Sequence, residues 1–419
     1  MGPDAVAIFV GNGHVTRSND TDYPFRQDSD FWYLTGFDHP GAVAVLRSDG
    51  GAEYSLYVEP RDPAAETWTG YRPGTEGAVR DHGADEAHPA ERFLDHLTDL
   101  VGDVRRIFHV LGRNPDIDAR ITNTIEELRR RSRQGTNPPE AIVDPRGIVH
   151  EMRLHKQPEE LDIMRRAAAI SAEAHEQAAR LAQPGLWEYE LEAVIEYTFR
   201  RRGARGPAYT SIVGGGRNAT VLHYVTNDSK LRTEELVLID AGCELEGYAS
   251  DVTRTYPIGG QFSGPGRAIY EVVLGSQQAA LAECRPGGTL PGVHAAALRT
   301  LVEGLVDLKL LSGDVEELVA QEKYRPFYMH NTSHWLGLDV HDVGTYRRGE
   351  EPRVLEPGMV FTVEPGLYVA ESNEDIDARF RGIGVRIEDD VVVTADGHEN
   401  LTAAIPSLPD DLEALVSER

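Results

Sequence analysis

The chain has 419 residues, 40% of them hydrophobic and 26% charged, which describes a globular protein too long for one ordinary core. Its formal net charge of −27 argues against nucleic-acid binding, which needs basic patches, and no apolar run reaches the length of a transmembrane helix. Two cysteines make a disulfide framework implausible and the N-terminus lacks the features of a signal peptide, so we expect a cytoplasmic protein.

The first 145 residues alternate short apolar strands with helical patterns, which predicts an α/β domain over 1–145. Strands are expected at 5–10, 42–46, 54–58 and 106–111, and helices at 91–101 and 118–132. No glycine-rich phosphate loop follows any of these strands, so the sequence gives no support for nucleotide binding.

Proline and charged residues dominate the next stretch, and we predict a linker at 146–157. Pro158 followed by two glutamates is typical of a helix start, and the Pro184–Gly185 pair should end that helix. Three more helices are expected, namely one that carries Leu191, Ile195 and Phe199 on one face and ends near Gly203, and two over 264–283 and 291–311. Strands should dominate 355–395, so the second domain, 158–405, is predicted as α+β with a mostly antiparallel sheet, followed by a tail at 406–419.

Four acids and one histidine of the second domain stand out because of where they lie. They are Asp240, Asp251, His334, Glu364 and Glu388, each in a segment that reads as the end or middle of a β-strand. Apolar strands normally avoid acids, because burying an unpaired carboxylate is very costly. A pair of divalent metal ions would explain all five residues together, since oxygen-rich ligands with one imidazole suit Mn²⁺, Co²⁺ or Zn²⁺.

Each of these residues also has an ordinary structural explanation. Asp240 can cap the turn after its strand, Glu388 can pair with Arg386, and a lone histidine such as His334 is often a satisfied core residue. The joint pattern is stronger than any part, since a glycine between Asp240 and Asp251 can turn a hairpin that brings both together. No HExxH motif, nucleophile elbow or Cys–His signature competes with this interpretation.

Three segments around these residues closely resemble the aminopeptidase P family of pita-bread metallopeptidases. They are SHWLGLDVHDVG (333–344), LEPGMVFTVEPGLY (355–368) and RGIGVRIEDD (381–390). Residues 21–43 also look like the N-terminal domain of that family, so the resemblance covers almost the whole chain. It implies an α/β N-terminal domain and an α+β catalytic domain of the pita-bread type. Asn331–Thr332, where glycine is common, departs from the family pattern without touching a ligand position.

The resemblance implies a centre of two divalent metal ions, with Mn²⁺ as the family default. Asp240 would hold one ion, while His334 and Glu364 would hold the other. Asp251 and Glu388 would bridge both ions. The implied activity is hydrolysis of the bond between any N-terminal residue and a following proline by a metal-activated hydroxide. The expected substrates are therefore peptides with proline at the second position.

The same resemblance assigns roles in catalysis. Glu364 would take a proton from the attacking water and pass it to the leaving proline nitrogen. His341 would stabilise the oxyanion or shuttle protons, and His223 would contact the substrate near the scissile bond.

A second group of residues is expected around the proline ring of the substrate. A rigid pyrrolidine without an N–H favours apolar and aromatic walls, for which Tyr368 and Trp335 are candidates. His330 would help to line this pocket, and Arg386 would position Glu388 or a substrate carboxylate.

Several alternatives share this fold. A prolidase, which cuts only Xaa-Pro dipeptides and can carry a phosphotriester side activity, would use the same ligands, although the N-terminal domain favours the aminopeptidase. Metal-free hydrolases and non-catalytic binding modules of pita-bread type lack the five ligands that this chain has. The resemblance also implies a homodimer or homotetramer.

Overall fold

The computed structural model describes residues 1–48 and 52–418, and the chain divides into two compact units, Met1–Glu151 and Met152–Arg419. Each unit has a hydrophobic core of its own. Among the described residues, no helix combines the length and the apolar character needed to cross a bilayer.

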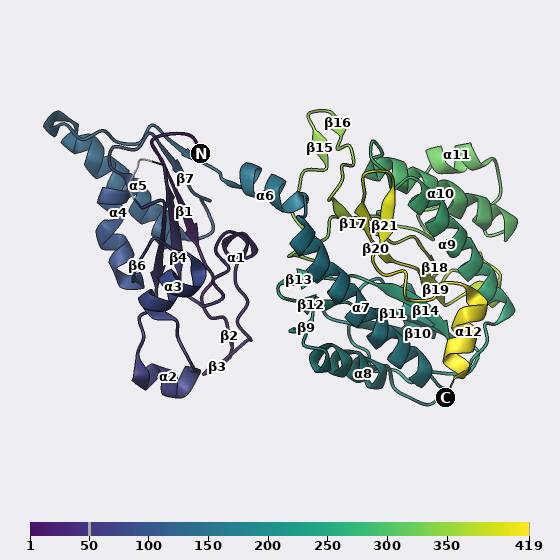
Figure 1. Ribbon diagram of the computed structural model, residues 1–419. Coiled ribbons are helices and arrows are strands. Elements are labelled where there is room, and N and C mark those ends of the chain that lie inside the picture. The colour runs from purple at the N-terminus through teal and green to yellow at the C-terminus, as the bar shows by residue number, and fades with distance from the viewer. Residues whose placement is uncertain (49–51, 419) are drawn as a thin grey trace. The chain divides into compact units, whose positions relative to one another are not determined.

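The first unit is built on a six-stranded sheet in the order β6-β5-β4-β1-β7-β8 (Figure 1). Its strands are β1 (Ala5–Val10), β4 (Val43–Arg47), β5 (Tyr54–Val58), β6 (Glu86–Pro89), β7 (Arg106–Phe108) and β8 (Ala141–Val143). The central strand β1 pairs antiparallel with β4 and parallel with β7. A separate short hairpin joins β2 (Thr16–Ser18) and β3 (Thr21–Asp22).

Helices cover both faces of this sheet, namely α1 (Ser29–Thr35) and α3 (Gly74–His82) on one and α4 (Phe93–Val101) and α5 (Pro115–Arg131) on the other. A further helix, α2 (Pro63–Thr69), has no buried residue. Alternate residues of β1 supply the two cores: Ile8 packs with residues of α4 and α5, and Phe9 packs with residues of α1 and α3. The unit is therefore α/β, as predicted, although α2 and α3 were not expected.

The segment between the two cores is more regular than its composition suggested. The predicted linker at 146–157 contains α6 (Arg146–Leu154), and the boundary between the units falls inside this helix. Strand β8 precedes it and extends the sheet of the first unit. The buried residues Val149 and Leu154 give α6 an apolar side that its many charged neighbours obscure in the sequence.

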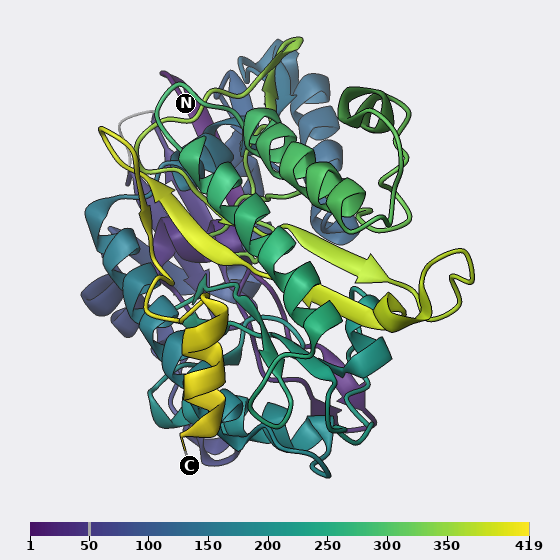
Figure 2. The ribbon, with the colours of Figure 1, turned by 90° about the vertical axis from the view of Figure 1, so that its right-hand side faces the viewer.

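The helices of the second unit lie largely where the sequence predicts them. They are α7 (Pro158–Leu181), α8 (Glu188–Arg201), α9 (Gly264–Ala282), α10 (Leu290–Asp307), α11 (Val315–Ala320) and α12 (Pro409–Ser417). Helices α9 and α10 run side by side in both views (Figures 1 and 2). The predicted tail at 406–419 is instead largely helix α12, which places Leu412, Leu415 and Val416 in the main core.

The strands of the second unit form several small sheets rather than one large one. They are β9 (Gly206–Pro207), β10 (Ile212–Gly215), β11 (Leu236–Asp240), β12 (Cys243–Leu245), β13 (Tyr248–Ala249), β14 (Thr253–Pro257), β15 (Arg347–Arg348), β16 (Glu351–Pro352), β17 (Val360–Val363), β18 (Gly366–Val369), β19 (Ile383–Arg386), β20 (Asp389–Val393) and β21 (His398–Asn400). Every strand pair in the described part of this unit is antiparallel. This confirms the predicted α+β class.

Candidate metal centre

A hairpin brings the first two acids together. Asp240 is the last residue of β11 and pairs with Thr253, the first residue of β14, so Asp251 lies just beyond the end of the same ladder. Between these strands, β12 and β13 form a tight turn at Glu246 and Gly247, whose φ angles of 50° and 86° suit a two-residue hairpin. The predicted turn therefore exists.

A second antiparallel pair positions the two glutamates. Val363 at the end of β17 lies opposite Asp389 at the start of β20, so Glu364 and Glu388 are the next residues at the same end of the pair. A β-bridge between Thr253 and Glu388 joins this pair to the first sheet. The four carboxylates thus meet where two small sheets abut.

His334 differs from the prediction, because its segment is not a strand. Residues 330–342 form an irregular stretch attached to β17 by the bridge between Trp335 and Phe361. The backbone oxygen of His334 accepts a hydrogen bond of 3.0 Å from Thr362 N. Trp335 and Leu336 are adjacent in the sequence and both fully buried, so the segment lacks the alternation of buried and exposed side chains that a strand at a sheet surface has.

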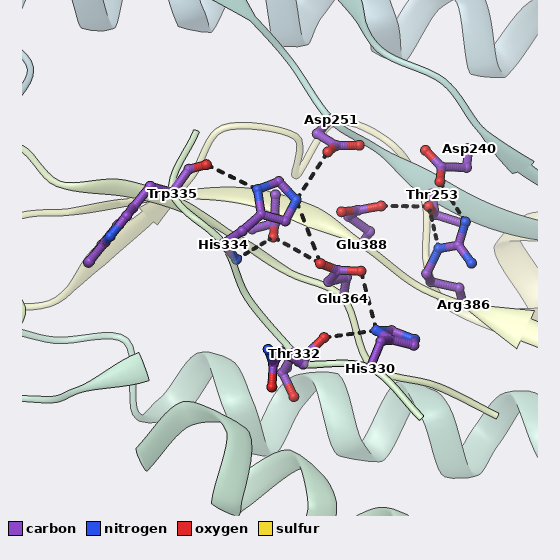
Figure 3. A network of polar contacts seen from close by, with 12 residues as sticks. Asp240, Asp251, Thr253, His330, Thr332, His334, Trp335, Glu364, Arg386 and Glu388 are labelled. Atoms are coloured by element: carbon purple, nitrogen blue, oxygen red, sulfur yellow. Dashed lines mark hydrogen bonds and ion pairs between the residues drawn. The ribbon is translucent and has the colours of Figure 1, made fainter. Parts of the chain in front are cut away.

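All five candidate ligands line one cavity of about 770 Å³. His334 Nε2 lies 3.4 Å from Asp251 Oδ2 and 3.6 Å from Glu364 Oε1 (Figure 3). Ligand atoms of Asp251, His334 and Glu388 lie within 4.8 Å of one another, a spacing that suits a shared metal ion. Asp240 lines the same cavity next to Arg386.

Hydrogen bonds prepare these side chains for ligation. His334 Nδ1 donates to the carbonyl oxygen of Trp335 at 3.0 Å, which orients the ring so that Nε2 faces the acids. Thr253 Oγ donates to Glu388 Oε2 at 2.6 Å and accepts from Arg386 Nε at 3.0 Å. Thr253 thus links Arg386 to Glu388 by hydrogen bonds, whereas Arg386 Nη2 bonds directly to Asp240 Oδ2 at 2.5 Å.

The buried acids of the cluster favour the binding of positive charge, as the pKa values of its members show. Burial raises the pKa of Asp240 and of Glu388, and it raises the pKa of Glu364 to about 7 against the opposing charges of His334 and Arg386. Burial by itself lowers the pKa of His334, but the hydrogen bond to Asp251 and the charges of Glu364 and Asp251 raise it to about 9. Without a cation, this cluster binds protons. Four carboxylates and an imidazole whose Nε2 faces them are a donor set that fits divalent ions such as Mn²⁺, Co²⁺ or Zn²⁺.

The candidate substrate residues take different positions around the cavity. His223, His330, His341 and Arg386 line it. The ring of His341 lies 4.2 Å from that of His334, centroid to centroid. Burial, followed by the charge of Arg386, lowers the pKa of His330 to about 4.

Two of the aromatic candidates lie behind this wall. The Tyr368 hydroxyl bonds to His330 Nε2 at 2.9 Å and accepts from Arg386 Nη1 at 3.0 Å. Tyr368 thus supports two cavity residues instead of lining the cavity. Trp335 is fully buried in a core cluster, so it is a packing residue and not a pocket wall.

Sequence reasoning missed one residue of the centre. Tyr209 lines the cavity, and its hydroxyl donates to Asp240 Oδ1 at 2.5 Å. Burial and the nearby acids, Asp240 first among them, hold the pKa of Tyr209 well above its usual value. Tyr209 precedes β10 in a stretch without periodicity, so no local signal in the sequence distinguishes it from an ordinary loop tyrosine.

Comparisons with known proteins agree with the sequence over both units. Residues 162–395 match the model of metallopeptidase family M24, and residues 1–108 match that of the aminopeptidase P N-terminal domain. The chain is 47% identical to an Xaa-Pro aminopeptidase of Escherichia coli (strain K12), over 99% of this chain and 94% of the relative. It is 35% identical to Homo sapiens Xaa-Pro aminopeptidase 3, over 100% of this chain and 82% of that protein.

Solved structures show the same similarity in three dimensions. Pseudomonas aeruginosa aminopeptidase PepP superposes with a TM-score of 0.97 at 48% identity and covers 100% of this chain and 95% of its own. Escherichia coli aminopeptidase P with the inhibitor Pro-Leu superposes with a TM-score of 0.95 at 47% identity, over 99% of this chain and 94% of its own.

Proposed function

The chain belongs to metallopeptidase family M24 and carries the N-terminal domain of aminopeptidase P, and from this premise we infer that it is an Xaa-Pro aminopeptidase. Its pita-bread domain hydrolyses the bond between an N-terminal residue and a following proline. The observation that carries this conclusion is the convergence of all five metal-ligand candidates on one cavity, in a chain similar over its full length to Xaa-Pro aminopeptidases.

We propose that the five residues hold two divalent ions, with Mn²⁺ as the physiological metal. Asp240 serves one ion, His334 and Glu364 serve the other, and Asp251 and Glu388 serve both. This division is consistent with Glu388 lying between His334 and Asp240 in the view of Figure 3, and with ligand atoms of Asp251, His334 and Glu388 lying within 4.8 Å of one another. Bound there, such ions supply a water molecule that is acidic enough to attack near neutral pH.

Glu364 is the proposed proton carrier. Its carboxylate takes the proton of the attacking water and delivers it to the proline nitrogen as the peptide bond breaks. The position fits this role, because Oε1 faces His334 at 3.6 Å while Oε2 faces His330 at 3.6 Å across the cavity wall. His341 stabilises the charge that develops on the substrate carbonyl oxygen.

Recognition of the substrate falls to the cavity walls. His223 approaches the substrate near the scissile bond, and His330 contacts the proline ring. The apolar side chains of Ile212, Leu222 and Val340 also line the cavity. A tertiary amide offers no N–H for a hydrogen bond, so such walls select proline by shape.

The activity test uses Mn²⁺-loaded protein with Arg-Pro-Pro and, separately, with Ala-Pro. Release of arginine from the tripeptide is the expected result, and Glu364→Gln is the matched variant, which should fold and lose most turnover. Hydrolysis of the dipeptide alone would make the protein a prolidase instead. Activity that survives thorough chelation would overturn the metal requirement.

We further propose a cytoplasmic protein that assembles as a homodimer or homotetramer. Both cysteines, Cys243 and Cys284, are free and buried, which is consistent with a reducing compartment. Light scattering coupled to size-exclusion chromatography measures the assembly, and a monomeric mass would refute this part of the proposal.

A further inference from the structure

Glu188, the first residue of α8, is a buried carboxylate that the metal centre does not use. It is 0% exposed, and within the described chain it forms no ion pair with a cationic side chain. An unpaired buried carboxylate is costly unless hydrogen bonds satisfy its oxygens. The partners of Glu188 therefore indicate what it does.

Four donors from one loop satisfy this carboxylate. Oε1 accepts from Gly215 N at 2.7 Å and from Asn218 Nδ2 at 2.9 Å. Oε2 accepts from the Tyr224 hydroxyl and from Ser229 N, both at 2.8 Å. All four partners donate, so both carboxylate oxygens are used as acceptors. The backbone of Glu188 also donates to Ser229 O at 3.0 Å.

These donors lie at the two ends of, and within, the segment 215–229, which forms one wall of the cavity. After β10 the chain makes one short 3-10 turn, Gly216–Thr220, and then continues without regular structure to residue 229. Leu222, His223 and Val225 of this segment line the cavity. Tyr224, between them, turns its hydroxyl to Glu188 instead.

His223 depends on this segment for its position. In the described part of the chain, no hydrogen bond or ion pair is recorded for its own side chain, and it lies on the exposed rim of the cavity. Its position follows that of the flanking chain, which is bonded to Glu188 through the side chains of Asn218 and Tyr224 on either side of it and through the backbone N–H groups of Gly215 and Ser229. A shift of the loop would move His223 while the five metal-ligand residues, which lie on other segments, stay in place.

We propose that Glu188 is a positioning residue for substrate binding, which fixes the 215–229 loop and through it His223. The expected effect on KM rests on the proposed peptidase function, whereas the anchoring of the loop by Glu188 is independent of that function. A purely structural role would affect stability alone, whereas a positioning role acts through His223 and changes how the substrate is held.

The test replaces Glu188 by glutamine. The side chain keeps its shape, but one carboxylate oxygen becomes an NH₂ group that faces two hydrogen-bond donors and cannot accept from them. Loss of an acceptor at two buried donors should raise KM for Arg-Pro-Pro about tenfold, with a smaller change in kcat and with metal content retained. Thr198→Val is the matched control, since Thr198 is buried on the same helix but bonds only to Val194 O within it. This control should leave KM unchanged.

A double-mutant cycle with His223→Ala separates positioning from general damage. If Glu188 acts through His223, Glu188→Gln should change KM by less than about twofold in the His223→Ala background. Effects that multiply in the double variant would overturn the proposal, as would an unchanged KM in Glu188→Gln alone. If Glu188→Gln does not fold, Tyr224→Phe removes one donor only and should raise KM about threefold, again only when His223 is present.

Amide hydrogen exchange provides a readout that needs no substrate. Exchange of residues 216–229 should be about tenfold faster in Glu188→Gln than in the wild type and in Thr198→Val. Unchanged exchange would refute the anchoring. A third outcome separates the two proposals. If exchange is faster in Glu188→Gln but the wild type does not cleave Arg-Pro-Pro, the proposed function is refuted and the anchoring is established.

Discussion

Thr253 offers the sharpest test of how the metal centre is held. Its side chain is fully buried and joins Glu388 to Arg386 by two hydrogen bonds, of 2.6 and 3.0 Å. Thr253→Val keeps the shape and removes both bonds. A hydrogen bond to a charged group contributes about 1.5–3 kcal/mol, so losing the bond that orients Glu388 should weaken metal binding by roughly 10-fold to 100-fold.

The measurement is a calorimetric titration of the metal-free protein with Mn²⁺. Thr253→Ser is the matched control, because it keeps the hydroxyl and loses only a methyl group, and its dissociation constant should stay within about threefold of the wild type. Turnover of Thr253→Val should recover in part when Mn²⁺ is raised. A Thr253→Val variant that binds Mn²⁺ as tightly as the wild type would refute the idea that this hydroxyl orients Glu388.

Three further outcomes are expected. Glu388→Ala should lose metal by elemental analysis together with activity, and full metal content in this variant would remove Glu388 from the ligand set. His341→Ala should lower turnover at least about tenfold while metal stays bound, because the role proposed for His341 is in the reaction and not in metal ligation; loss of metal would contradict this role. Burial lowers the pKa of His175 to about 4 in the folded chain. As pH falls below about 6.5, His175 is therefore protonated in the unfolded chain before it is protonated in the folded one. Stability from His175 is thus complete above that pH and lost toward pH 4. Between these values the metal-free wild type should lose about 3 kcal/mol of unfolding free energy more than His175→Gln, as measured by urea denaturation, and equal losses would refute the assignment.

The acids of the centre could be identified from the sequence because their positions conflict with local structure. Asp240 ends an apolar strand, and Glu364 and Glu388 interrupt two others, which is costly without a compensating cation. His334 could be identified by its neighbours, but its backbone conformation could not be predicted, since a short apolar run such as Trp335–Leu336 does not distinguish a buried irregular segment from a strand.

The elements that sequence reasoning misjudged are short and depend on tertiary contacts. Helix α12 has only 9 residues, too few to be stable alone, and it forms because Leu412, Leu415 and Val416 enter the main core. Helix α6 has a similar length, and charged residues outnumber the apolar ones that it buries. In both cases the packing that decides the structure involves residues distant in the sequence.

The residues that support the site, Glu188 and Thr253, could not be predicted from the sequence, because each has an ordinary explanation in its own helix or strand. An acid in the first turn of a helix is expected to interact with the helix dipole, and Glu188 reads that way in the sequence. In the structure its carboxylate instead receives four donors from residues 27 to 41 positions further along the chain. Thr253 likewise reads as an ordinary strand threonine, although it connects Glu388 with Arg386.

Thr253 and Glu188 support two different parts of the site, the acids and the loop of His223, and the two parts can be tested separately. Thr253 bonds to Glu388 and Arg386 bonds to Asp240, and among the described cavity-lining residues Arg386 is the one permanent cation facing four carboxylates. Glu188 holds the loop of His223 and makes no bond to any of those acids. Metal affinity should therefore respond to Thr253→Val and not to Glu188→Gln, while KM responds to Glu188→Gln even at saturating metal. If both variants changed both quantities alike, the two halves would be one coupled network, and neither residue could be assigned a separate role.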